Sequence, residues 1–434
     1  ELKGDGLLRN AGGRVLVQAT SLNRIGTLFQ QSEAGSVMQL DSGRRLQFSG
    51  SSSNFTGGEV TELNSRAYLD VLTAMRLQSV LVRPGLSLAG NGLYGHLILE
   101  RDMAVRDVFI SSGCWTCEGG RLEVQDSASV HIESILVSTY GYLDLTSDIN
   151  VSLVTMTTGR MRVVGKRRLA PGTRVVMQTE AYIVGTAAEA DVLTVTDGSV
   201  IDFASGYYRN RGVRNAVLRV QDGGQVLMGY EERNYYPDYM FVTLDSGAVV
   251  EVAPQGLLHM TRTWAELKGD GVLRNAGGRV LVQATSLNRA SCALAMTAGT
   301  VQIGSGQGLI LQGQATHFET GAVQGTSGPL VLYGAALLGM RNATHPSEQT
   351  LTVEPPVFVG DGSTAVTAAF GTAAFSRAVN IRAQATVAVP EDGLCAFAQV
   401  LNAGLVSIHA NATATLPDGQ YQQQATGTLQ GHFN

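Results

Sequence analysis

Two cysteines in this chain have the spacing of redox and zinc motifs. Cys114 and Cys117 form the sequence Cys-Trp-Thr-Cys. A redox role for such a pair requires a helix N-terminus in a βαβ setting, and a zinc site requires a second pair of ligands nearby. The surrounding sequence offers neither context, so we expect a local disulfide or two packed thiols. With only Cys292 and Cys395 in addition, the sequence predicts no metal site, no cofactor and no disulfide framework.

Acidic and basic residues that could catalyse a reaction are not clustered. Glycoside hydrolysis needs a pair of carboxylates, but Glu231 and Glu232 are adjacent, and a strand would direct them to opposite faces. The histidines occur singly and are interpreted as surface or packing residues: His96, His131, His259, His317, His345, His409 and His432. We therefore expect no catalytic residues and no enzyme activity.

One group of aromatic residues could form a binding surface. Tyrosine offers a wide apolar area with a polar tip, so the group is consistent with a sugar-binding or subunit-contact surface, or else with a long loop that packs on its own coil. Its members are Tyr207, Tyr208, Tyr230, Tyr235, Tyr236 and Tyr239. A basic run at Lys166, Arg167 and Arg168, preceded by Arg160 and Arg162, is interpreted as a solvated edge rather than an anion site.

Four Asn-X-Ser/Thr sequons match the N-glycosylation rule, at Asn54, Asn150, Asn342 and Asn411. We expect them at outward positions and predict that several carry glycans. This expectation presumes a eukaryotic-type secretory route.

Composition restricts the remaining possibilities. The 434 residues include 52 glycines, 44% are hydrophobic and only 15% are charged, which is typical of many short strands interrupted by turns. The formal net charge of -5 argues against a nucleic-acid or anionic-membrane partner, because phosphate binding requires a basic stripe. No run of about 18 apolar residues occurs, so we expect no membrane insertion.

The chain contains a long internal duplication. Residues 1–24 (ELKGDGLLRNAGGRVLVQATSLNR) recur at 266–289 with a single difference, Leu7 against Val272. Weaker similarity continues from Ala34 and from Ala298. This super-repeat predicts a repetitive architecture rather than several globular domains.

A shorter repeat lies inside the super-repeat. Alternating apolar residues flank an Asp or Gly turn, for example around Asp197, Asp222 and Asp245. Asp and Gly tolerate the left-handed backbone of a sharp turn, and the alternation indicates strands buried on one side. The spacing between these aspartates predicts coils of about 24 residues. We expect the apolar residues around Asp222 to point inward, in register with those around Asp245: Leu218, Val220, Val226 and Met228, against Phe241, Leu244, Val250 and Val252.

Strings such as LRVQDGGQVLM and VTLDSGAVVEV resemble the parallel β-helix proteins of the pectate-lyase-like superfamily, particularly the adhesin and autotransporter-passenger type. The resemblance lies in the form of the repeats over nearly the whole chain, not in a diagnostic motif. It implies an all-β, right-handed, single-stranded parallel β-helix in an extracellular or cell-surface setting. Lyases of this superfamily use calcium-binding carboxylates and a catalytic arginine, and this chain has no Asp-rich run for such a site.

These observations predict a single β-helix with a first super-repeat over residues 1–264 and a continuous second one over 265–434. The predicted function is that of a non-enzymatic structural protein, a subunit or segment of a self-assembling surface fibre, sheath or mastigoneme-like flagellar appendage. The predicted partners are copies of itself or other fibre subunits. The alternatives are a cell-surface adhesin that binds glycans, and a polysaccharide lyase or hydrolase.

The beginning of the chain suggests how self-assembly would occur. Residues 1–24 match an internal coil, and internal coils leave strand edges for their neighbours. We expect protein to cover this first coil in the native assembly, with Leu2, Leu8 and Val15 packed against another subunit or a longer polypeptide.

Overall fold

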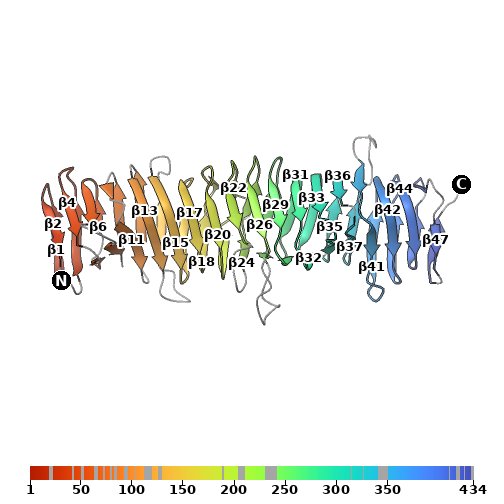
Figure 1. The fold of residues 1–434 in the computed structure, drawn as a ribbon, viewed down its shortest axis with the longest axis horizontal. Coiled ribbons are helices and arrows are strands. Elements are labelled where there is room, and N and C mark those ends of the chain that lie inside the picture. The colour runs from red at the N-terminus through yellow and green to blue at the C-terminus, as the bar shows by residue number, and fades with distance from the viewer. Residues whose placement is uncertain are drawn as a thin grey trace. The chain divides into compact units, whose positions relative to one another are not determined.

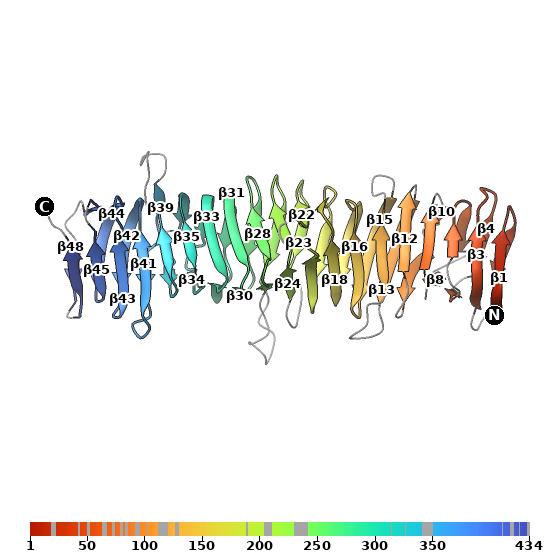
Figure 2. The same ribbon diagram turned by 180° about the vertical axis from the view of Figure 1, so that it is seen from behind.

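The computed structural model describes most of the chain, and every regular element in the described part is a β-strand. The described residues are 1–18, 23–41, 44–49, 53–62, 67–71, 74–78, 81–82, 86–91, 96–101, 103–111, 120–125, 130–187, 190–203, 211–229, 242–313, 315–325, 327–340, 350–409, 411–416, 421–424 and 426–431. They divide into two compact units, Glu1–Asp202 and Phe203–Asn434. Within each unit, successive coils stack along parallel ladders, which Figure 1 shows from one side and Figure 2 from the other.

Three sets of parallel strands, named here ladders A, B and C, run through the first unit. Ladder A consists of β1 (Leu2–Asn10), β3 (Asn23–Gln31), β5 (Arg45–Phe48), β8 (Ala67–Val71), β11 (Leu86–Asn91), β13 (Met103–Ser111), β15 (Val130–Ser138), β17 (Val151–Met156), β20 (Arg174–Met177) and β23 (Val200–Asp202). Ladder B starts on the second half of β3 and continues through β6 (Ser53–Phe55), β9 (Ala74–Gln78), β12 (His96–Arg101), β14 (Arg121–Val124), β16 (Gly141–Leu145), β18 (Gly159–Val163) and β21 (Ala181–Gly185). Ladder C consists of β2 (Arg14–Val17), β4 (Val37–Leu40), β7 (Glu59–Glu62) and β10 (Leu81–Val82), and a separate pair joins β19 (Lys166–Arg168) to β22 (Val192–Val195).

The second unit also has three ladders, named D, E and F. Ladder D consists of β24 (Arg211–Arg214), β27 (Val242–Leu244), β30 (Trp264–Lys268), β32 (Leu287–Ala290), β34 (Leu309–Leu311), β37 (Leu330–Leu332), β40 (Val357–Val359), the second halves of β42 (Ala373–Ile381) and β44 (Leu394–Asn402), and β47 (Tyr421–Gln423). Ladder E consists of β25 (Val217–Val220), β28 (Val249–Val252), β31 (Val272–Val282), β33 (Ala293–Ile303), β35 (Thr316–Phe318), β38 (Ala336–Leu338), β41 (Val366–Phe370), β43 (Ala385–Val389), β45 (Leu405–Ile408) and β48 (Thr428–Gly431). Ladder F consists of β26 (Gln225–Met228), β29 (Leu257–Met260), the second halves of β31 and β33, β36 (Gly321–Gln324), β39 (Leu351–Val353), the first halves of β42 and β44, and β46 (Thr413–Thr415).

Each unit is therefore a parallel β-solenoid, which confirms the predicted fold class. The handedness of the coil stays a prediction. The coil length is close to the predicted value in many coils, as the pairing of Gly159 with Ala181 and of Val249 with Val272 shows. The boundary predicted at residue 265 falls inside β30 of the second unit, so the super-repeat division remains a property of the sequence.

Among the described residues the strand alternation was predicted correctly, but the register between Asp222 and Asp245 was wrong; Phe241 lies outside the described residues. Leu218 and Val220 point inward and are fully buried, as expected. Their strand partners, however, are Val250 and Val252. The number of residues between each residue and its partner is larger than the number between Asp222 and Asp245. The reason is that each coil has three sides. The segment around Asp222 covers ladders E and F, whereas the segment around Asp245 covers ladders D and E, so their separation is not the coil length.

The turn chemistry agrees with the sequence. Asp197 and Asp222 adopt φ values of 50° and 46°, in the left-handed region. The Asp222 N–H donates to the Pro254 carbonyl at 3.1 Å, so this turn stacks on the corresponding turn of the next coil. Turns thus extend the ladder hydrogen bonds around the corners of the solenoid.

Within each unit, apolar side chains from its own ladders fill the interior. In the first unit, Phe29, Phe48 and Phe55 are fully buried, with ring centroids 5.1 to 5.8 Å apart. In the second unit, Phe375 and Phe397 stack at 5.1 Å beside Phe370. Each such burial contributes roughly 1.5–3 kcal/mol, so the packed interior is the main source of stability.

Candidate functional site

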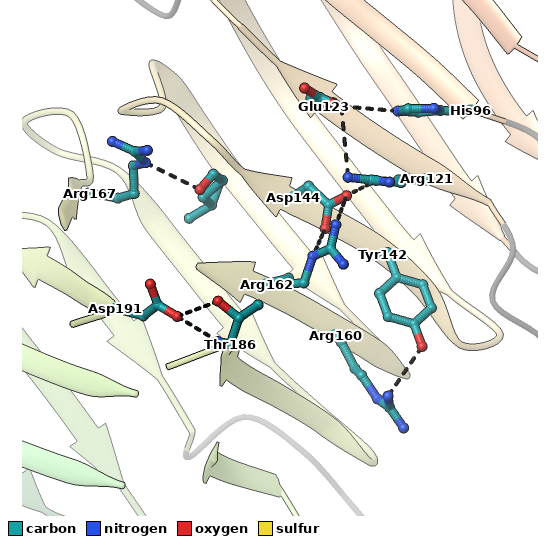
Figure 3. Close-up of polar contacts among 11 residues, drawn as sticks. His96, Arg121, Glu123, Tyr142, Asp144, Arg160, Arg162, Arg167, Thr186 and Asp191 are labelled. Atoms are coloured by element: carbon teal, nitrogen blue, oxygen red, sulfur yellow. Dashed lines mark hydrogen bonds and ion pairs between the residues drawn. The ribbon is translucent and has the colours of Figure 1, made fainter. Parts of the chain in front are cut away.

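A cluster of charged and aromatic side chains lies on the outer face of ladder B in the first unit. Strands β12, β14, β16, β18 and β21 direct alternate side chains inward, and the residues between them form two parallel outer rows (Figure 3). Row 1 consists of His96, Arg121, Tyr142, Arg160 and Tyr182, which are cross-strand neighbours. Row 2 consists of Arg76, Ile98, Glu123, Asp144, Arg162 and Val184.

Asp144 is held between arginines of the preceding and following coils. Arg162 approaches it with two nitrogens, Nε at 2.8 Å from Oδ1 and Nη2 at 3.1 Å from Oδ2. Arg121 forms an ion pair with Asp144 through its Nε. The Asp144 side chain has no exposed area, so the two guanidinium groups compensate for the loss of water around the carboxylate. Asp144 therefore cross-links three successive coils.

His96 and Glu123 extend this network toward the preceding coil. The His96 Nε2 lies 3.3 Å from a Glu123 carboxylate oxygen, and the same carboxylate is 3.8 Å from Arg121. Burial lowers the pKa of His96, and the neighbouring Arg121 charge lowers it further, although Glu123 opposes both effects. His96 is therefore neutral at physiological pH and adds no positive charge to the face.

Tyr142 and Arg160 form a flat polar pair in row 1. The Arg160 guanidinium lies 5.6 Å from the Tyr142 ring centroid, and its Nη1 donates to the Tyr142 hydroxyl at 3.2 Å. Arg160 is exposed and Tyr142 is half-buried. Such cation–π pairs hold the guanidinium in place while leaving it in contact with solvent.

A second group of polar contacts nearby anchors a loop. Asp191 accepts hydrogen bonds from the backbone N–H groups of Gly165 at 2.5 Å, Thr186 at 2.5 Å and Ala187 at 2.7 Å. Figure 3 shows its contacts with Thr186. Burial alone would raise the pKa of the Asp191 carboxyl, but the N–H groups of Ala187, Gly165 and Thr186 outweigh it and lower the pKa. This aspartate fastens a turn to the preceding coil and has a structural role.

The second unit repeats the arginine–acid–arginine arrangement. Glu251 lies between Arg219, whose Nε is 2.7 Å from it, and Arg274, whose Nη1 is 3.5 Å from it. The neighbouring outer row there is apolar and contains Val217, Val249 and Val272. Cross-coil acid pairing thus occurs in both units, whereas the tyrosine–arginine row belongs to the first.

The arrangement does not offer acid–base chemistry at Asp144, because a general acid or base needs access to its substrate and a proton to exchange. Among the described residues, no group of three or more His, Cys, Asp or Glu side chains could hold a metal ion. Cys292 is buried, and burial raises the pKa of its thiol to about 11; burial also raises the pKa of Cys395. Neither thiol has the lowered pKa of a nucleophile. None of the described residues forms a helix that is long and apolar enough to cross a membrane.

Several predicted site residues lie outside the described residues. These are Asn342, Cys114, Cys117, Glu231, Glu232, and the six tyrosines Tyr207, Tyr208, Tyr230, Tyr235, Tyr236 and Tyr239. Their predicted roles stay predictions.

Three predicted glycosylation sites are described. Asn54 faces outward between the buried Ser53 and Phe55, Asn150 lies 3.4 Å from a ring nitrogen of His131, and Asn411 is exposed in a turn with φ of 62°. All three positions reach solvent, and the attachment of glycans stays a prediction.

The basic run was predicted as a solvated edge, and this is only partly correct. Lys166 and Arg168 are exposed. Arg162, in contrast, is engaged with the enclosed Asp144. Asp144, and Arg121 which pairs with the same carboxylate, were not identified from the sequence, although each occupies an outward position in an alternating strand. That alternation is the signal that could have identified them.

Comparison with known proteins gives little further information. No protein-family profile matches the chain, and no curated protein matches it. Among solved structures, the chain is similar to a fragment described as "Crystal structure of TibC-catalyzed hyper-glycosylated TibA55-350 fragment". The identity is 11%, the match covers 95% of this chain and 98% of that one, and the TM-score is 0.20. A likeness at this TM-score supports no inference about function.

Proposed function

We propose that this chain is a non-enzymatic, extracellular structural protein, a β-solenoid subunit or segment of a self-assembling surface fibre or sheath. The observation that supports the proposal is that acidic side chains on the outer faces pair with arginines of neighbouring coils. Asp144 in the first unit and Glu251 in the second lie between arginines of neighbouring coils, where they connect coils and are not free to react. A carboxylate that cross-links coils suits a scaffold, whereas a hydrolase or lyase needs accessible acid and base groups.

The outer face of ladder A provides an apolar surface for lateral contact in such an assembly. Leu136 on β15 and Leu153 on β17 are both 37% exposed and lie on neighbouring strands of the ladder, where Leu136 pairs with Thr155 and Leu153 with Ser134. Two exposed leucines that lie diagonally across neighbouring strands suit a contact surface better than isolated ones.

The full chain can be tested by light scattering after size-exclusion chromatography, and by electron microscopy across a range of protein concentrations. We expect species larger than a monomer that grow with concentration and form repeating particles. A matched variant, Leu136→Glu with Leu153→Glu, should weaken assembly through this face, while Asp148→Asn on the exposed surface serves as the control. A particle that is monomeric at every concentration would contradict the fibre proposal.

The non-enzymatic part has a separate test. The chain is incubated with a panel of neutral and acidic polysaccharides, and new reducing ends and unsaturated products are measured. We expect neither to form. Cleavage that Glu123→Gln or Asp144→Asn abolishes would replace the structural function with a hydrolase or lyase.

A further inference from the structure

The outer face of ladder A carries two parallel rows of side chains on β13, β15, β17 and β20, named here the ladder A patch. One row, the acid–base row, consists of the cross-strand neighbours Asp107, Ser134, Leu153 and Arg174. The residues between the two rows point inward and are buried: Val108, Ile135, Val154 and Val175.

The second row of the patch is apolar apart from one threonine and is named the apolar row. It consists of the cross-strand neighbours Phe109, Leu136, Thr155 and Val176. The side chains of both rows are half-buried or exposed. The ladder A patch is therefore open to contact with another molecule.

The order of side chains in each row is complementary to its own reverse. When the patch faces a reversed copy of itself, β13 lies against β20 and β15 lies against β17. In the acid–base row, Asp107 at one end then faces Arg174 from the other end. In the apolar row, Phe109 faces Val176. Opposite charges and apolar groups thus meet their own kind of partner at both ends of the patch.

The exposed leucines are complementary to the reversed patch in shape. Leu136 faces Thr155 and Leu153 faces Ser134, so each long side chain lies against a short one. Side chains of two sheets that pack face to face interdigitate in this way. A patch with two leucines facing each other directly would be held apart by them instead.

The two charged residues at the ends of the acid–base row are held in place by contacts within the chain. The Ser134 hydroxyl donates to Asp107 Oδ1 at 2.7 Å, and Arg174 Nη2 lies 2.7 Å from Asp202 Oδ2. A guanidinium has five N–H donors, and 54% of the Arg174 side chain is exposed, so it can bind a second carboxylate. Asp107 and Arg174 lie three strands apart, about 14 Å, and cannot pair with each other in one chain.

We propose that the ladder A patch binds the same patch of a second copy of this chain, with the axes of the two first units antiparallel. The two-fold axis runs parallel to the strands, between β15 and β17. Each Asp107 then pairs with the partner's Arg174, so the dimer contains two equivalent ion pairs with interlocked leucines between them. This inference rests on the lateral contact of the proposed function and names its partner and orientation. Because such an interface is closed, growth into a fibre requires a further surface.

Charge reversal tests the orientation of the two copies. Asp107→Arg and Arg174→Asp each place like charges opposite each other when the variant pairs with itself, so each alone should dimerise at least about tenfold more weakly than the parent chain. A mixture of the two variants restores opposite charges at both contacts, as do both changes in one chain. Each should bring the dimer affinity back to within about threefold of the parent value. Sedimentation velocity over a series of concentrations measures all of these affinities.

Arg168→Asp is the matched control. Arg168 on β19 is 51% exposed and pairs with Asp197 across coils at 3.0 Å, much as Arg174 pairs with Asp202, but β19 is not part of ladder A. This variant should leave the dimer affinity unchanged. Circular dichroism and thermal unfolding show whether each variant is folded. If a reversal variant is not, Asp107→Asn or Arg174→Gln takes its place, with an expected severalfold loss of affinity.

The outcomes separate this inference from the proposed function. Equal losses in Arg168→Asp and Arg174→Asp, or no recovery when the folded single variants are mixed, would overturn the antiparallel dimer; large assemblies of the parent chain would still support the fibre. A dimer that follows the charge exchange but never grows with concentration would support this inference and contradict the fibre. A parent chain that is monomeric at every concentration would overturn both.

Discussion

Residues 1–24 and 266–289 are almost the same sequence in two different surroundings. Over the first part of the segment, both copies pair with the next coil in the same way: Leu2 pairs with Ile25 and Leu267 with Ala290. In the second part the registers differ, because Val15 pairs with Met38, whereas the equivalent Val280 pairs with Val301, two residues earlier. Their burial differs greatly. Leu2 is 53% exposed, whereas Leu267 is fully buried.

The difference follows from the neighbours that each copy has. In the second copy, β31 packs between β28 and β33, and β30 between β27 and β32. Among the described strands, β1 pairs with β3 alone. Nearly identical sequence therefore takes the same register only over the first part of the segment, whereas the preceding coil determines the burial of its leucines.

The largest expected effect on the free energy of unfolding comes from truncating the first leucine of the second copy, compared with the same truncation in the first copy. Leu267→Ala leaves a cavity in the interior and should reduce the free energy of unfolding by about 2–5 kcal/mol. Leu2→Ala should change it by less than about 0.5 kcal/mol, because Leu2 is exposed. Chemical denaturation, together with hydrogen exchange of the affected coil, measures both. Similar losses in the two variants would show that Leu2 is also packed in the native protein.

Two equivalent glycines, Gly6 and Gly271, test the same contrast between the two copies, because they differ in steric crowding. A Cβ added at Gly271 would lie 2.7 Å from the Ala248 carbonyl oxygen and 2.8 Å from the Leu244 Cβ, whereas one added at Gly6 meets nothing within 4 Å. Gly271→Ala should therefore destabilise the second unit by about 1–3 kcal/mol. Gly6→Ala should be neutral or slightly stabilising, because it reduces the freedom of the unfolded chain. Thermal unfolding of the pair measures the difference, and a destabilising Gly6→Ala would contradict the open space at that position.

A buried asparagine supports the same turn in both copies. The Asn10 and Asn275 side-chain carbonyls accept the N–H groups of Gly13 and Gly278 at 3.1 and 3.0 Å. Gly278 is buried and Gly13 is exposed, so only Gly13 can exchange this bond for one with water.

Asn275→Ala should therefore cost about 1–3 kcal/mol, and Asn10→Ala clearly less. Hydrogen exchange at Gly278 and Gly13 reports the loss of each bond directly. Equal costs would indicate that the Gly13 N–H is shielded from water in the native protein.

The sequence predicted which residues point inward better than it predicted the residues with which they pair on the neighbouring strand. Alternation around Asp222 identified Leu218 and Val220 as core residues, because the period of two is a local property of a strand. Their pairing with Val250 and Val252 depends on the length of the intervening chain, and no local pattern encodes that length.

The site on ladder B was harder to predict for the same reason. Asp144 meets Arg162 across a short coil, in which Gly141 pairs with Gly159, and it meets Arg121 from the coil before. Each residue alone resembles an ordinary outward polar residue. The ion-pair network becomes visible only when the registers of three coils are known.

The smallest expected effect concerns an ion pair that both copies share. Arg24 lies 3.5 Å from Glu1 and Arg289 lies 3.4 Å from Glu266, with Lys3 and Lys268 as second partners. The Glu266 side chain is 7% exposed and that of Glu1 is 29% exposed. Glu266→Gln should reduce the free energy of unfolding by about 1 kcal/mol, whereas Glu1→Gln should cause no measurable change, because solvent screens the exposed pair.

The Glu1 pair nevertheless has a detectable signature in its titration. The hydrogen bond from Lys3 lowers the pKa of the Glu1 carboxyl below 4.5, desolvation opposes this effect, and the charges of Lys3 and Arg24 lower the pKa further. A lowered carboxyl pKa means that any stabilisation is present above the unfolded value of 4.5 and is lost as the pH falls through the lower folded value. Carbon-detected NMR titration of Glu1 should show a midpoint below 4.5, which Lys3→Gln moves upward. A midpoint that Lys3→Gln leaves unchanged would show that the ion pair at the first copy does not form in solution, and the two copies would then differ in their charge contacts as well as in their burial.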